Sequence, residues 1–219
     1  YKIFLTRSLL LLLFAGAMSC AERTATTGDW PQFKKDNFRS GASPVSLDLT
    51  NLDEAWTYHA SQEPVAAWYG PAKEDAYAKS GPLPSMRDYD LAYYPVIVGN
   101  SLYYSSTSDD AVHCIDTKNG KEKWRFTTNA PIRIAPVFYK GNLFFGSDDG
   151  FVYSIDADDG DLNWKYSPVP EGERLLMQNS RLISFWPIRT GVLVEDDHVY
   201  FGASLLPWKK SYFCAINSN

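Results

Sequence analysis

Residues 114–124 read Cys-Ile-Asp-Thr-Lys-Asn-Gly-Lys-Glu-Lys-Trp, and residues 154–164 read Ser-Ile-Asp-Ala-Asp-Asp-Gly-Asp-Leu-Asn-Trp. The two segments share an aspartate, a glycine and a tryptophan at the same spacing, forty residues apart. The repeated positions are Asp116, Gly120 and Trp124 in one copy and Asp156, Gly160 and Trp164 in the other. A fixed period of about forty residues indicates a repeat architecture, in which each unit is one supersecondary structure stacked on the next.

The similarity extends beyond these two segments. Leu102-Tyr103-Tyr104 recurs as Leu143-Phe144-Phe145, a third copy runs from Thr190 to Asn217, and an earlier partial copy ends at Trp56. Each unit holds four short segments rich in β-branched and aromatic residues, which are typical of strands. The Asp-Asp-Gly triplets at 148–150 and 158–160 indicate hairpin turns.

Four strands in about forty residues predict an all-β fold, a β-propeller of four-stranded antiparallel blades. We expect blades at 45–58, 93–128, 134–168 and 190–219, so that about three to four blades of an incomplete ring are present. The sequence begins with Tyr1 rather than Met and stops at Asn219 inside a repeat, and we expect a piece of a longer protein.

The composition excludes several other classes. Of the 219 residues, 45% are hydrophobic and 15% aromatic, whereas disordered chains are poor in aromatic residues. Three cysteines are too few for a disulfide framework. The net charge of −5 argues against a nucleic-acid partner, because phosphate binding requires a concentrated basic face.

The N-terminus has the features of an export signal. Lys2 and Arg7 precede an apolar run, Leu9–Met18, which is too short to span a bilayer. Residues 1–19 are therefore predicted to be a signal peptide. Ala17-Met18-Ser19-Cys20 resembles the bacterial lipobox, so that Cys20 would carry a lipid and residues 20–28 would form a linker to the propeller at 29–219. The alternative is an ordinary secretory signal with a chance cysteine.

The Asp-x-x-x-Gly-x-x-x-Trp repeat resembles the PQQ-like β-propeller repeat of the quinoprotein alcohol dehydrogenase-like superfamily. That superfamily includes quinoprotein dehydrogenases and the propeller lipoprotein of the bacterial outer-membrane-protein assembly machinery. Asp29-Trp30-Pro31-Gln32-Phe33 also resembles the N-terminal segment of bacterial members. The resemblance, over residues 29–219, implies a bacterial cell-envelope location, on the periplasmic side of the outer membrane or at the cell surface.

Within that resemblance the repeated residues have a structural interpretation. Trp124 and Trp164, together with Trp56, would dock one blade on the next against Gly120 or Gly160. The alternative is an indole that stacks on a cofactor. The repeated aspartates would cap backbone N–H groups in turns rather than serve as catalytic acids.

Functional residues are expected in the insertions that interrupt the repeat, residues 60–92 and 166–189, because loops on a rigid scaffold concentrate binding residues. The arginines and tryptophans of these insertions would either line a site for an anionic or planar ligand, or form surface ion pairs and cover blade edges. A further insertion, Leu205–Trp208, would be either an exposed apolar tip or a packed plug. The candidate ligand or partner residues are Trp68, Arg87, Arg181, Trp186, Arg189 and Trp208.

Local catalytic and metal-binding motifs are absent from the sequence. Cys20, Cys114 and Cys214 are far apart, the three histidines are scattered, and there is no phosphate loop or nucleophile elbow. Cys114 and Cys214 occupy the same strand of nonadjacent copies and are expected to be buried thiols rather than a disulfide. We therefore predict no catalytic residue, metal or cofactor, and a noncatalytic scaffold that binds protein partners or a small ligand at the propeller funnel. The alternative is a quinoprotein-type alcohol or sugar dehydrogenase domain with PQQ and Ca²⁺. A carbohydrate-binding propeller is also compatible with the aromatic loops.

Overall fold

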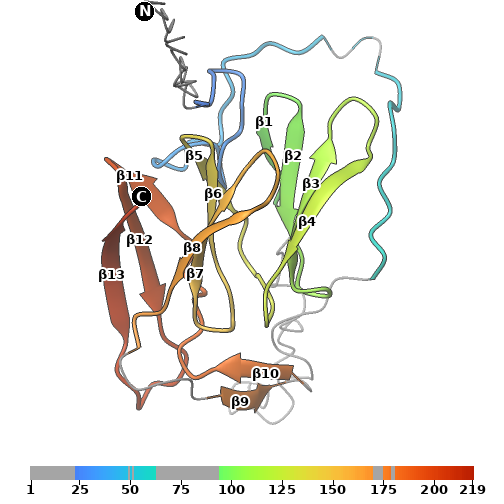
Figure 1. The fold of residues 1–219 in the computed structure, drawn as a ribbon. Helices are drawn as coiled ribbons and strands as arrows, with labels where there is room; N and C mark the ends of the chain where they lie inside the picture. Colours follow the sequence, from blue (N-terminus) through green and yellow to red (C-terminus); the bar gives the residue numbers. More distant parts are fainter. Residues whose placement is uncertain (1–22, 49, 51, 63–93, 170–174, 179–180) are drawn as a thin grey trace, which may run out of the picture.

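The computed structural model describes residues 23–48, 50, 52–62, 94–169, 175–178 and 181–219, and these residues form antiparallel sheets that stand side by side (Figure 1). Two sheets have four strands in sequential order, the third has three, and a separate two-stranded hairpin lies at one end. The first sheet contains β1 (Val96–Val98), β2 (Ser101–Ser105), β3 (Ala111–Asp116) and β4 (Glu122–Thr127). The second contains β5 (Val137–Tyr139), β6 (Asn142–Gly146), β7 (Val152–Asp156) and β8 (Leu162–Tyr166).

The third sheet contains β11 (Leu193–Glu195), β12 (His198–Ala203) and β13 (Tyr212–Asn217), and the hairpin contains β9 (Leu175–Gln178) and β10 (Arg181–Ser184). The described residues hold no helix. The predicted all-β class and the four-stranded antiparallel blades of an incomplete propeller are confirmed. The described sheets form an open arc rather than a closed ring.

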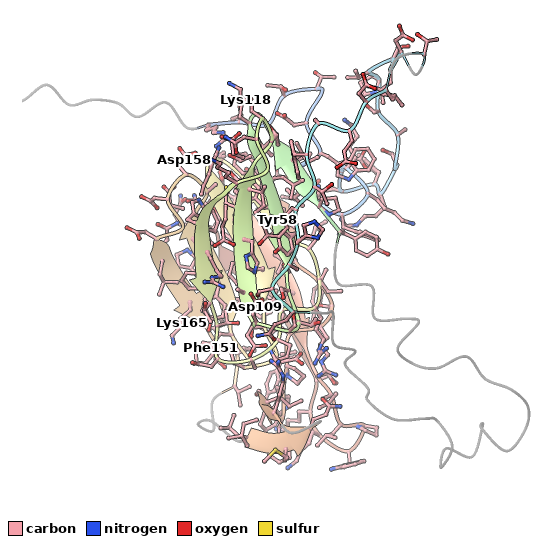
Figure 2. All side chains as sticks on the ribbon, turned by 90° about the vertical axis from the view of Figure 1, so that its right-hand side faces the viewer. Tyr58, Asp109, Lys118, Phe151, Asp158 and Lys165 are labelled. Carbon is pink, nitrogen blue, oxygen red and sulfur yellow. The ribbon has the colours of Figure 1, made fainter. Side chains whose placement is uncertain are left out.

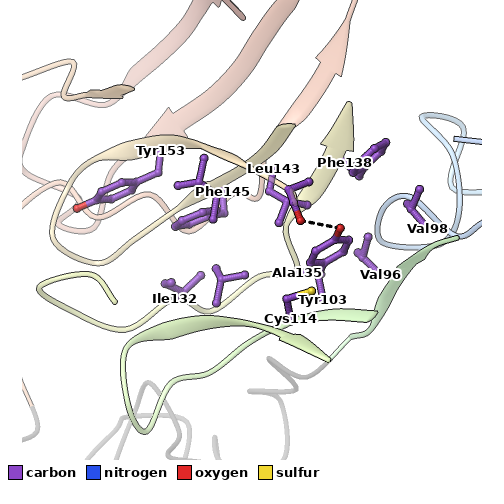
Figure 3. Packing of buried hydrophobic residues seen from close by; sticks show 13 residues of the cluster. Val96, Val98, Tyr103, Cys114, Ile132, Ala135, Phe138, Leu143, Phe145 and Tyr153 are labelled. Atoms are coloured by element: carbon purple, nitrogen blue, oxygen red, sulfur yellow. Dashed lines mark hydrogen bonds between the residues drawn. The ribbon is translucent and has the colours of Figure 1, made fainter. Parts of the chain in front are cut away.

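Two apolar cores fill the spaces between successive sheets. Between the first and second sheets, Tyr103, Phe138 and Phe145 are nearly inaccessible to water and pack with smaller aliphatic side chains (Figure 3). Between the second and third sheets, Phe144 and Phe201 are likewise nearly inaccessible to water and belong to the second core. Each of these two cores is formed by side chains from two neighbouring sheets. A described sheet therefore buries its apolar side chains only by packing against the next sheet.

Trp56 and Trp124 each lie over a left-handed glycine of the following sheet. The φ angles of Gly120 and Gly160 are +68° and +82°, which an L side chain rarely adopts. A methyl group at Gly120 would lie 2.7 Å from Trp56 Cε3, and one at Gly160 would lie 2.7 Å from Trp124 Cε3. Because only glycine leaves this space, the indole ring rests directly on backbone.

The indole N–H groups show one departure from the repeat. Trp56 Nε1 donates to Thr117 O at 2.8 Å, and Trp164 Nε1 donates to Ser218 O at 3.1 Å. The equivalent acceptor for Trp124 is Ala157 O, which accepts instead from the Tyr103 hydroxyl at 2.9 Å (Figure 3). Among the described residues Trp124 Nε1 is buried without a partner. Burial raises the pKa of Tyr103 to about 12.

The N-terminal segment connects the innermost strands of the three sheets. Trp30 exchanges two backbone hydrogen bonds with Ile97 of β1, and Phe138 N of β5 donates to Pro31 O at 2.8 Å. Asn37 Nδ2 donates to Val194 O of β11 at 3.2 Å. The Asp-Trp-Pro-Gln-Phe segment therefore links the sheets along their inner edge, a role that the sequence alone does not indicate.

Asp29 fixes the start of this segment. Its carboxylate accepts hydrogen bonds from Thr26 N at 2.6 Å and from Gly99 N, in the β1–β2 turn, at 2.8 Å. Burial disfavours the charged form, but the hydrogen bonds from Gly99 and Thr26 outweigh it and lower the pKa of Asp29.

Two details differ from the expectations. The sequence predicts a closing strand of a first blade before Trp56, but residues 52–60 form no strand, because no described strand lies beside them to complete a hydrogen-bonded ladder. Cys114 and Cys214 are free thiols, as expected, but only Cys114 is buried. Cys214 is partly exposed because β13 is the edge strand of a three-stranded sheet.

The glycine–indole contact predicts a marked loss of stability in Gly160→Ala. The new methyl group would collide with Trp124 and occupy a left-handed backbone, so the free energy of unfolding should fall by about 2 kcal/mol or more. Urea unfolding followed by tryptophan fluorescence measures the change. The matched control is Gly41→Ala, since Gly41 has a φ of +63° and open space around it. Equal losses in the two variants would contradict the packing interpretation.

Candidate functional site

One end of the sheets gathers the loops that carry charged side chains, and we call it the loop end. It consists of the β2–β3 loop at 106–110, the β6–β7 loop at 147–150, the β9–β10 hairpin and the β12–β13 loop at 204–211, all at the lower end of Figure 1. In Figure 2, Asp109 and Phe151 lie toward this end, whereas Lys118 and Asp158 lie at the opposite end.

Asp148 is the centre of the charged groups at the loop end. Its carboxylate is inaccessible to water and accepts from Arg133 Nε at 2.6 Å and from Arg189 Nε and Nη2 at 2.7 Å each. Arg189 Nη2 also donates to Gln178 Oε1, at the end of β9, at 2.9 Å. One buried carboxylate therefore joins the entry to the second sheet, the entry to the third sheet and the hairpin between them.

The two arginines come from equivalent positions of consecutive repeats. Residues 131–133 and 187–189 both read Pro-Ile-Arg, just before the innermost strand of a sheet. Arg189 is among the candidate residues predicted from the sequence, whereas Arg133 is not, and Asp148 is predicted only as a turn residue. The repeated Pro-Ile-Arg triplet is a sequence signal that the two arginines are equivalent, but it does not identify the carboxylate that they share.

A second ion pair holds the hairpin to the first sheet. Arg181, at the start of β10, is paired with Asp110, and Arg181 Nη2 donates to Ser108 O at 2.7 Å. Burial raises the pKa of Asp110, although the charge of Arg181 and its hydrogen bond oppose the shift. The hairpin is thus attached to the loops of both complete sheets.

Asp109 and Asp149 occupy equivalent places in the two loops, and each contacts the side chain four residues later. Asp109 lies 3.0 Å from His113 Nε2, and Tyr153 OH donates to Asp149 Oδ2 at 2.5 Å. Burial raises the pKa of Asp149. Burial also disfavours the Asp109 carboxylate, but the Ser106 hydrogen bond and His113 outweigh it and lower that pKa.

His113 has a second acidic neighbour, because its Nδ1 lies 2.7 Å from Glu122 Oε2. The imidazole also stacks on Tyr104, with ring centroids 4.6 Å apart. Tyr104 in turn donates to Tyr58 OH at 3.2 Å, so the segment after Trp56 contacts the outer face of the first sheet. The side chains of His113, Glu122, Tyr104 and Tyr58 therefore contact one another, and these contacts stabilise the surrounding loops.

The candidate residues from the sequence fall into four groups. Arg181 and Arg189 lie at the loop end and form ion pairs with Asp110 and Asp148. Trp186 is only 4% exposed and donates from Nε1 to Lys210 O at 2.8 Å, so its side chain packs inside the protein. Trp208 is 75% exposed, which agrees with the exposed tip rather than the plug. Cys20, Trp68 and Arg87 lie outside the described residues.

The structural repeat residues take the following positions. Asp116 and Asp156 accept from the backbone N of Lys118 and Asp158, at 2.8 and 2.7 Å, and so stabilise the β3–β4 and β7–β8 turns. Within the described ranges, no three His, Cys, Asp or Glu residues are grouped so that they could hold a metal ion. Within these same ranges, no helix is long and apolar enough to cross a membrane.

The comparisons with known proteins agree with this architecture. The family model of PQQ-like repeats that is described as "Outer membrane protein assembly factor BamB" matches residues 89–205, more than half of the chain. The chain belongs to this family. The expected membership of the PQQ-like propeller superfamily is therefore confirmed.

Relatives of this PQQ-like propeller chain include dehydrogenases. The chain is 29% identical over 122 residues to the dehydrogenase subunit of the alcohol dehydrogenase (quinone) from Gluconobacter oxydans, covering 50% of this chain and 16% of that protein. It is 29% identical over 117 residues to the quinohemoprotein alcohol dehydrogenase ADH IIB from Pseudomonas putida, covering 44% of this chain and 17% of that protein. The chain therefore spans about a sixth of the length of these relatives.

A solved structure shares the fold over most of the chain. The quinohemoprotein alcohol dehydrogenase from Comamonas testosteroni superposes with a TM-score of 0.61 and 20% sequence identity. The match covers 88% of this chain and 26% of that protein. This likeness concerns the propeller fold.

The buried ion pairs predict that Asp148→Asn destabilises the protein. The variant keeps the shape of the side chain but leaves two guanidinium groups without their shared counter-charge, which should cost about 3 kcal/mol or more. The urea midpoint measures the loss. Asp158→Asn is the control, because Asp158 pairs with Arg23 at the exposed opposite end and should unfold like the wild type. If both variants unfold alike, Asp148 does not hold the loop end together.

Proposed function

We propose that this chain is part of an exported, lipid-anchored PQQ-like β-propeller that acts as a noncatalytic binding or scaffold module in the bacterial cell envelope. The observation that carries the proposal is the internal pairing of the charged groups at the loop end. Arg133 and Arg189 share Asp148, and Arg181 is paired with Asp110. Buried charges that satisfy one another fix the shape of a surface and offer no reactive group.

Family membership supports the same proposal. The matching family is described by an assembly factor for outer membrane proteins, so we infer that the loop end recognises protein partners. The loop end is built from loops of all three sheets and the inserted hairpin, held by ion pairs to a rigid framework. We propose that blade docking maintains that framework, by Trp56 and Trp124 on the glycine turns and by Trp164 through its hydrogen bond to Ser218 O.

The second candidate function is a PQQ-dependent and Ca²⁺-dependent alcohol or sugar dehydrogenase, which the named relatives favour. PQQ is a tricarboxylate, so its binding site requires cationic side chains. The described arginines at the loop end do not fit this requirement as they stand, since each is already paired with a carboxylate of the protein. A quinone there would have to break ion pairs that connect the sheets.

Cofactor loading of the full-length protein that contains this chain separates the two functions. After incubation with PQQ and Ca²⁺ and removal of free quinone, we expect no stoichiometric quinone in the absorption spectrum and no dye-linked alcohol oxidation. A quinoprotein alcohol dehydrogenase treated in parallel serves as the positive control. One quinone retained per chain, together with alcohol-dependent dye reduction, would establish the dehydrogenase function instead.

The anchoring part of the proposal has its own test. Cells that express the full-length protein are fed an alkyne-labelled fatty acid, and the purified protein is examined for the label. We expect label on the wild type and none on Cys20→Ser, because the thiol of Cys20 is the attachment point in a lipobox. Cys214→Ser is the matched control, since Cys214 is a partly exposed free thiol of the propeller. An unlabelled wild type would leave an ordinary secretory signal as the interpretation of residues 1–19.

A further inference from the structure

The β12–β13 loop differs from the equivalent loops of the first two sheets. The loops at 106–110 and 147–150 are polar and largely buried, whereas the third loop carries Leu-Leu-Pro-Trp-Lys-Lys at 205–210. Trp208 within it is 75% exposed. We call residues 204–211 the Trp208 tip. An indole that is mostly in water at the end of a protruding loop requires a reason, because its burial removes on the order of 150–250 Å² from water.

The Trp208 tip is held in one shape by its own contacts. Lys209 N donates to Leu206 O at 3.0 Å, which closes a turn with Pro207 and Trp208 at its two central positions. The hydroxyls of Ser204 and Ser211 are 2.7 Å apart at the base of the loop. The buried indole of Trp186 donates to Lys210 O. The exposed position of Trp208 is therefore fixed by the structure and does not result from a loose loop.

The neighbouring hairpin exposes an apolar face at the same end. Leu175 and Met177 of β9 and Leu182 of β10 share one face of the two-stranded sheet, because Met177 pairs with Leu182 and alternate residues point to the same side. They are 46%, 68% and 55% exposed. Ser184 Oγ accepts from Trp186 N at 3.0 Å, so one residue contacts both the hairpin and the Trp208 tip.

The charges at this end favour an anionic partner. Lys209 and Lys210 follow Trp208 directly, and neither forms an ion pair with another described residue. Lys209 Nζ lies 5.9 Å from the centre of the Phe185 ring. The carboxylates of Asp110 and Asp148, at the same end, are matched by arginines inside the protein. The protruding groups are thus apolar and cationic, although the whole chain carries a net charge of −5.

We propose that the Trp208 tip and the outer face of the β9–β10 hairpin insert into the headgroup region of an anionic lipid bilayer. Tryptophan is enriched at that depth of a membrane, where its ring lies among acyl chains and its N–H remains hydrated. Lysines beside it keep their charge at the surface and attract anionic headgroups. The contact is independent of a lipid on Cys20, and it would orient the propeller with the loop end toward the membrane.

The proposal also explains why the exposed residues form projections. The apolar side chains stand on a turn and on one face of a hairpin, and such shapes enter a fluid interface without a matching pocket. We expect the two projections together to give weak, reversible association, because interfacial binding strength scales with the apolar area that is inserted.

Vesicle binding of the full chain tests the proposal. All proteins carry Cys20→Ser, which removes any attached lipid, and they are sedimented with vesicles of phosphatidylethanolamine and phosphatidylglycerol at increasing lipid concentration. Trp208→Ser should weaken binding by about fivefold or more, because the indole no longer enters the interface. Charge reversal in Lys209→Glu with Lys210→Glu should weaken it by at least as much and remove the preference over neutral phosphatidylcholine vesicles.

Phe38→Ser is the matched control. Phe38 is 93% exposed but follows Asn37, which is hydrogen-bonded to β11 away from the loop end, so this variant should bind vesicles like the parent. Circular dichroism checks that each variant keeps its strands. Binding of the Trp208→Ser variant equal to that of the parent would overturn the proposal. Absence of vesicle binding by the parent protein at all lipid concentrations would also overturn it.

Discussion

The contact between an indole ring and the backbone of a left-handed glycine joins one sheet to the next in this protein. Trp56 rests on Gly120, and Trp124 rests on Gly160, each across a boundary between repeats. The core between the first and second sheets depends on this spacing, because side chains such as Tyr103 and Phe145 fill the remaining space. Each contact requires glycine for both its φ angle and its missing Cβ. A larger residue at Gly120 or Gly160 would therefore push the indole ring away from the backbone on which it rests.

At the loop end, charged side chains connect the sheets to the loops and to the inserted hairpin. Asp148 receives arginines from two consecutive repeats, and Arg189 also reaches Gln178 of the inserted hairpin. Breaking such a buried group by removing one partner is costly, since the remaining charge stays out of water. The ion pairs hold an insertion that has no place in the repeat. The N-terminal segment performs a comparable task at the inner edge, where Pro31 and Asn37 bond to β5 and β11.

From these features together we propose that the loop end is a binding surface rather than a catalytic centre. The charged side chains of the loop end are engaged with one another, whereas the groups that project outward are apolar or lysine. We propose a scaffold in the cell envelope that meets protein partners through the shaped loops and the membrane through Trp208 and the hairpin. Family membership and the dehydrogenase relatives define the fold on which either function would be built.

The sequence by itself determined the all-β class, the forty-residue repeat and the positions of the glycine turns, because a local motif that recurs at a fixed period reports local backbone requirements. It did not reveal the Asp148 ion pairs, since Arg133 and Arg189 are 56 residues apart. Nor did it show that Trp186 is buried while Trp208 is exposed, although both lie outside the regular repeat. Burial and pairing depend on which segments the sheets bring together. Only the tertiary structure decided them, because proximity between distant residues is a property of packing and not of local sequence.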